Sequence, residues 1–120
     1  MPAQLIRAWF DRRFTLVSHP LQIDELRDVS RRDSIRRLFR PADAGRLVNL
    51  IMAMSDMPDF LPVVVRSRDP LDDFLLALCE AGRADLLITG DKDDLLALER
   101  HGPTCIATVR RLAIELGLAR

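Results

Sequence analysis

One stretch, residues 68–93, constrains the fold of this 120-residue chain more than any other. Pro70 and the acids after it are typical of a helix start, and Gly82 is typical of a helix end that tolerates positive φ. The apolar run Leu86–Ile88 then predicts a short, buried, central parallel strand covered on both faces. The strand ends at residues 89–91. Ligands of open α/β sheets bind at this carboxyl edge, so the stretch predicts a functional site there.

Three carboxylates flank the predicted strand. Asp73 lies at the start of the preceding helix, and Asp91 and Asp93 follow the strand directly. Each acid alone is ordinary helix-start or turn chemistry. Together they form a cluster that repels itself unless a cation is bound, and hard carboxylate oxygens suit Mg²⁺ or Mn²⁺ rather than zinc. We therefore predict that these three residues hold a divalent metal ion.

Residues 68–96 contain the pattern Arg-Asp-Pro-x-Asp-Asp-x-x-Leu-Ala, then an apolar strand and Thr-Gly-Asp-Lys-Asp-x-Leu. This pattern resembles the PIN-domain nucleases, in particular the VapC-like toxins of toxin–antitoxin systems. The resemblance implies a PIN-like three-layer α/β/α sandwich with a mainly parallel sheet. It also implies a metal-dependent endoribonuclease that binds Mg²⁺ or Mn²⁺, acts on RNA, pairs with a cognate antitoxin protein and forms a homodimer.

The resemblance implies a fourth acid in the metal site. Residues 18–26 are similar to a strand-then-helix segment of the family that carries a conserved acid, and Glu25 occupies that position. The residues alone do not distinguish Glu25 from Asp24 or Asp28. The alternative that Glu25 only interacts favourably with the dipole at the start of its helix stays open.

One element of the family has no counterpart. PIN domains begin with an apolar strand ending in a metal-binding Asp, whereas residues 2–6 lead into a helical pattern and Asp11 lies inside it. We expect the first central strand to be missing from this chain. We favour the explanation that the natural start of the chain lies upstream. The alternatives are that a partner supplies the strand or that the chain is a degenerate remnant. In the last case it is a catalytically impaired PIN remnant acting as an RNA- or antitoxin-binding module.

A receiver-like phospho-acceptor domain is a further alternative, because such domains also gather Asp residues around Mg²⁺. The lack of a first strand with paired acids disfavours it.

Asp69 and Asp72 are expected as capping or supporting residues of the metal site, and Lys92 as a phosphate contact.

The composition, 48% hydrophobic and 30% charged, predicts one globular domain over residues 1–120. No apolar run reaches the ~20 residues of a membrane helix and no signal peptide is visible, so we expect a cytoplasmic protein.

The charge is unevenly distributed along the chain. Residues 1–46 carry ten Arg against six acids, whereas residues 47–120 carry eight Lys or Arg against twelve acids. A basic flank beside an acidic metal site suits an anionic polymer, although a solvated helical face explains any single Arg as well.

Periodicity predicts the remaining elements. Helices are expected over 3–12, 22–31, 41–54, 70–82, 94–100 and 108–116, with a short helix from 33 or 34 to 39, and strands over 14–18, 60–65, 86–88 and 105–107. Cys79 and Cys105 lie in apolar patterns and are expected as free core residues. His19 and His101 are isolated, and we assign them no role.

Overall fold

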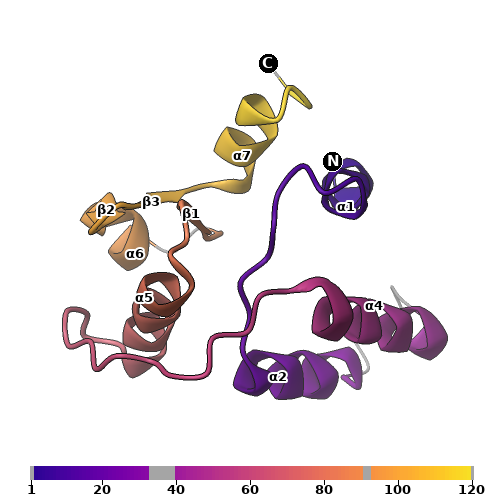
Figure 1. The fold of residues 1–120 in the computed structure, drawn as a ribbon, viewed down its shortest axis with the longest axis horizontal. Coiled ribbons are helices and arrows are strands. Elements are labelled where there is room, and N and C mark those ends of the chain that lie inside the picture. The colour runs from indigo at the N-terminus through magenta and orange to yellow at the C-terminus, as the bar shows by residue number, and fades with distance from the viewer. Residues whose placement is uncertain (1, 33–39, 91–92, 120) are drawn as a thin grey trace. The chain divides into compact units, whose positions relative to one another are not determined.

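The computed structural model describes residues 2–32, 40–90 and 93–119. They form a mixed α/β structure in two compact units: a smaller unit, residues 15–58, and a larger unit, residues 1–14 and 59–120 (Figure 1). The elements in chain order are the helices α1 (Pro2–Phe10), α2 (Pro20–Ser30), α4 (Pro41–Met54) and α5 (Pro70–Gly82), the strand β1 (Leu86–Ile88), the helix α6 (Asp93–Leu98), the strands β2 (Arg100–His101) and β3 (Thr104–Ala107), and the helix α7 (Val109–Glu115). Within the described ranges, every helix is too short or too polar to span a bilayer.

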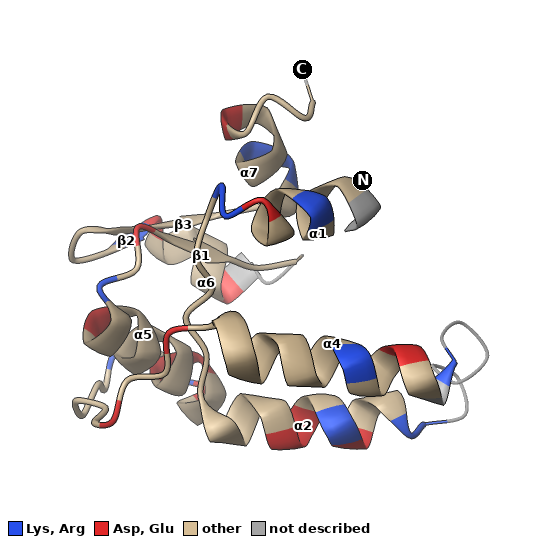
Figure 2. Ribbon diagram, turned by 45° about the vertical axis from the view of Figure 1, so that its right-hand side comes forward, with Lys and Arg blue, Asp and Glu red and all other residues tan. Residues whose placement is uncertain are grey.

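The smaller unit is a pair of helices, α2 and α4, that lie side by side (Figures 1 and 2). Ile23 and Val48 are its buried apolar residues. The predicted bounds of α4 are confirmed, and Pro at the first position explains its start. The predicted strand over 14–18 is wrong, because Val17 forms only a single parallel bridge before α2 begins. The short helix predicted up to residue 39 lies outside the described residues.

The core of the larger unit is a cluster of Leu76, Leu95 and Ile106, contributed by α5, α6 and β3. The sheet order is β1-β3-β2, with β1 parallel and β2 antiparallel to β3. The sheet is therefore mixed rather than mainly parallel, because Gly102, at φ +57°, turns the chain back between β2 and β3. In the described structure β1 has one neighbour only, so the central position predicted for Leu86–Ile88 is wrong there.

The segment Phe60–Val65 corrects another prediction. It forms no strand, and Phe60, Val63 and Val65 are 88%, 92% and 87% exposed, whereas Val64 packs against the core cluster. Pro62 has no N–H to donate to a neighbouring strand. A continuous apolar run thus partly buries Val64 here without forming a sheet.

The predicted bounds of α5, 70–82, are confirmed, but the residue in the left-handed conformation differs from the one expected. Arg83, not Gly82, takes the left-handed position after α5, at φ +51°, and Ala84 donates to the carbonyl of Cys79 in the manner of a Schellman motif. The helix α6 ends at Leu98, two residues before the predicted end at residue 100, and Glu99 follows it at φ +61°. Both residues accept a conformation that is costly for a side chain, because the chain must leave the helix there. The side chain of Thr108 caps α7 by accepting a hydrogen bond from the backbone nitrogen of Arg111.

The two cysteines are free, as predicted. Cys79 is buried on α5, and Cys105 on β3 is half-buried. Burial raises the pKa of the Cys79 thiol from 9.0 to about 11. Its thiolate is therefore scarce at neutral pH, which excludes Cys79 as a nucleophile.

Replacing Leu76 by Ala tests the core cluster. Leu76 is fully buried, so we expect a loss of about 2–5 kcal/mol in the free energy of unfolding, measured by urea denaturation. Leu71→Ala on the same helix is the matched control, because Leu71 is 66% exposed and its loss should cost less than about 0.5 kcal/mol. Equal losses from the two substitutions would show that α5 does not pack as described.

The burial of Cys79 predicts its reactivity and a pH dependence. Iodoacetamide at pH 8 should modify Cys105 first, and Cys79 only after denaturation, as read by peptide mass spectrometry.

The pKa of Cys79 also predicts a pH dependence of stability. Because its folded pKa of about 11 exceeds the unfolded value of 9.0, the folded state retains the thiol proton, and the free energy of unfolding should fall as the pH rises between these values. Cys79→Ala should reduce this fall, and an unchanged profile would contradict the assignment.

Candidate functional site

The start of α5 is a capped helix terminus that positions two acids. Oδ1 of Asp69 accepts a hydrogen bond of 2.9 Å from the backbone nitrogen of Leu71. A side-chain acceptor of this kind satisfies a backbone donor that the helix start leaves open. The predicted capping role of Asp69 is confirmed, and it fixes the first turn of α5, which contains Asp72 and Asp73.

Asp73 is half-buried and anchored through one carboxylate oxygen. Its Oδ1 accepts hydrogen bonds from the backbone nitrogens of Arg66, at 3.0 Å, and Ser67, at 2.7 Å. Within the described part of the chain, its Oδ2 accepts none. Asp73 is therefore held in one orientation with one hard oxygen left for a ligand.

Asp72 is the most deeply buried acid that the structure describes, with 1% of its surface exposed. It precedes the fully buried Leu76 by four residues and so shares its face of α5. The hydroxyl of Ser67 lies 3.4 Å from its Oδ2. Burying a carboxylate costs free energy unless hydrogen bonds or a cation compensate its charge. We expected only a supporting role for Asp72, and its spacing from Leu76 is the sequence signal for its burial.

Asp73 and Asp93 lie at the starts of two helices that share the core. Asp93 is the first residue of α6, although its side chain lies outside the described structure. Leu95, two residues later, packs in the same cluster as Leu76, three residues after Asp73. Both views show α5 and α6 as neighbours (Figures 1 and 2). The backbones of Asp73 and Asp93 are thus each within one helical turn of a residue of this cluster.

The other predicted site residues, Glu25, Asp91 and Lys92, stay predictions as partners of Asp73. Asp91 and Lys92 lie outside the described residues, so their roles stay predictions. Glu25 is exposed on α2 in the smaller unit, whereas Asp73 belongs to the larger one. Among the side chains that the structure describes, no three of His, Cys, Asp and Glu form a group able to hold a metal ion.

His101, to which we assigned no role, joins β2 to α5 and to the loop before it. Its Nε2 lies 2.6 Å from Oε2 of Glu80, and its Nδ1 lies 2.9 Å from Nη1 of Arg66, which also donates to the carbonyl of Arg100 at 2.7 Å. Arg66 can only donate, so Nδ1 is the acceptor and a proton on Nε2 faces Glu80. This network holds Arg66, whose backbone N–H donates to Asp73. No local pattern predicts it, because Glu80 and His101 are 21 positions apart.

Comparison with known proteins identifies the family. A family model described as PIN domain matches residues 1–93. No curated protein matches, and no solved structure matches. The matched residues make up more than half of the 120-residue chain and include the segment that carries Asp72 and Asp73. The chain therefore belongs to the PIN domain family.

Proposed function

We propose that this chain is a Mg²⁺- or Mn²⁺-dependent endoribonuclease and the toxin of a type II toxin–antitoxin pair. Its membership of the PIN domain family supports nuclease activity, because PIN domains are generally metal-dependent nucleases. The matched region contains all four acids of the predicted site, Glu25, Asp73, Asp91 and Asp93. The observation that carries the proposal is the carboxylate of Asp73, held by two backbone N–H groups with Oδ2 left for a ligand.

The chemistry of the donor set fits a hard divalent cation. Its four members are carboxylates, and Mg²⁺ and Mn²⁺ prefer such oxygens. Bound there, the metal ion supplies an activated water and neutralises charge on the scissile phosphate. In this proposal Asp73, Asp91 and Asp93, helped by Glu25, hold the ion, and Lys92 contacts a phosphate.

The fold and partner proposals rest on family membership and on the resemblance. In the described structure one edge of β1 has no neighbour, and we propose that a further strand of the three-layer sandwich pairs with this edge. A cognate antitoxin, a homodimer and action on cytoplasmic RNA complete the proposal. They follow from the resemblance alone.

Asp73→Asn tests the site. The Asn carbonyl oxygen still accepts the N–H groups of Arg66 and Ser67, so the fold should persist while one negative charge is lost. We expect Mg²⁺-dependent cleavage of single-stranded RNA, followed on denaturing gels, to be abolished with little change in melting temperature.

Asp69→Asn is the matched control. It removes the same charge from the same region, and Asn caps a helix about as well as Asp. Cleavage should therefore persist. Full activity of Asp73→Asn would contradict the proposed site. Wild-type protein that binds RNA without cleaving it would favour the catalytically impaired binding module.

Removal of the metal is an independent test. RNA cleavage by the wild-type protein should stop in EDTA and return when excess Mg²⁺ or Mn²⁺ is added, because water activation depends on the ion. Cleavage that persists in EDTA would contradict a metal-dependent mechanism.

A further inference from the structure

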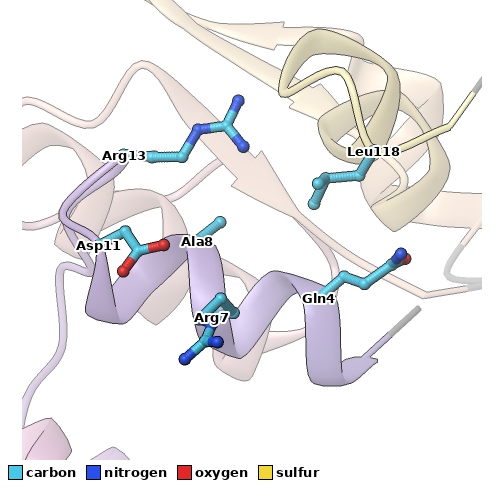
Figure 3. A pocket seen from close by; sticks show the side chains of 6 residues that line it. All are labelled: Gln4, Arg7, Ala8, Asp11, Arg13 and Leu118. Atoms are coloured by element: carbon cyan, nitrogen blue, oxygen red, sulfur yellow. The ribbon is translucent and has the colours of Figure 1, made fainter.

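A groove between α1 and the end of α7, here called the α1–α7 groove, forms a cavity of about 330 Å³ in the larger unit (Figure 3). Its lining comes from α1, the turn after it and the residues after α7, namely Gln4, Arg7, Ala8, Asp11, Arg13 and Leu118. Residues 4, 7, 8 and 11 recur at helical spacing, so one face of α1 and its continuation lines the groove.

The end of α1 explains why Arg13 lies over this face. Arg12 adopts the left-handed conformation, at φ +59°, and the backbone nitrogen of Arg13 donates to the carbonyl of Ala8 at 2.9 Å. This Schellman-type turn brings Arg13 back toward the helix. Nη2 of Arg13 donates to the backbone carbonyl of Leu116 at the end of α7, which ties the two walls together.

The described lining of the groove contains two arginines and one acid. Arg7 and Arg13 are exposed, and within the described part of the chain neither forms an ion pair with a carboxylate. Asp11 is the one acid in the lining. By contrast, Arg46 on α4 has Asp43 at 3.8 Å, and Arg111 on α7 has Glu115 at 3.2 Å.

We infer that the α1–α7 groove binds a phosphate of a single-stranded RNA backbone, with the guanidinium of Arg7 as the principal contact and Arg13 as the second. The planar guanidinium donates two parallel hydrogen bonds to a phosphate. Asp11 lines the same groove, but no ion pair joins it to Arg7. Leu118, which is half-buried, provides an apolar surface in the lining against which a sugar or base can pack. This inference rests on the proposed function in taking RNA as the ligand.

The test is binding of a fluorescent single-stranded RNA, measured by anisotropy at several salt concentrations in EDTA, so that no cleavage occurs. Arg7→Gln should weaken binding several-fold and reduce the slope of log Kobs against log salt by about 0.7, the value for one phosphate contact on a single strand. Asp11→Asn should act in the opposite direction and tighten binding, because it removes the one carboxylate that repels a phosphate there. Arg13 is not the test residue, because it also holds Leu116.

Arg46→Gln and Asp28→Asn are the matched controls. They make the same charge changes on α4 and α2, outside the groove. Both should leave the salt slope unchanged. If the controls shift binding as much as the groove variants do, net charge explains the effect and the groove assignment is overturned.

The outcomes separate this inference from the proposed function. Cleavage of RNA in Mg²⁺ with no effect of Arg7→Gln on binding overturns the groove and leaves the nuclease standing. Binding that depends on Arg7 without any cleavage supports the groove and removes the nuclease. A wild-type protein that binds no single-stranded RNA, but binds an acidic peptide or duplex DNA through Arg7, overturns the inference about the ligand.

Discussion

The larger unit depends on the burial of three side chains, Leu76, Leu95 and Ile106, from three different elements. Because Leu76 and Leu95 are fully buried, α5 and α6 can turn little about their axes without exposing them. The acids of α5 therefore have defined places relative to the core. Asp72 shares the face of Leu76, and Asp73 lies one residue further around the helix, next to the loop that donates to it.

Much of the helical structure could be predicted from residues that act locally. Pro41 and Pro70 mark helix starts because the missing N–H costs nothing at the first position, and Asp69 and Thr108 cap through their own side chains. The end of α5 at Gly82 could be predicted, but the left-handed residue could not, because Gly82 is the more permissive residue and the chain nevertheless uses Arg83. The carbonyls of Ala84 and Asp85, just after this turn, accept hydrogen bonds from Thr104 and Cys105 of β3, which are distant in sequence.

The candidate site is likewise only partly predictable from local sequence. A carboxylate at the start of α5 follows from the pattern of Pro70 and the acids after it, but the two backbone donors on Asp73 and the network through His101 do not. They depend on the path of residues 60–67, of which we expected 60–65 to form a strand. Strand pairing is set by partners elsewhere in the chain, so a β-branched run such as Val63–Val65 predicts an extended backbone better than it predicts a neighbour.

Pro62 has a consequence for how the exposed run Phe60–Val65 meets other chains. In an extended backbone, the N–H groups of alternate residues face the same edge, so Pro62 interrupts the donors of one edge, while Leu61, Val63 and Val65 retain theirs on the other. A cross-β fibril needs continuous pairing on both edges of every strand. The run is therefore apolar enough to attract a strand, but Pro62 prevents it from serving as the repeating unit of an amyloid.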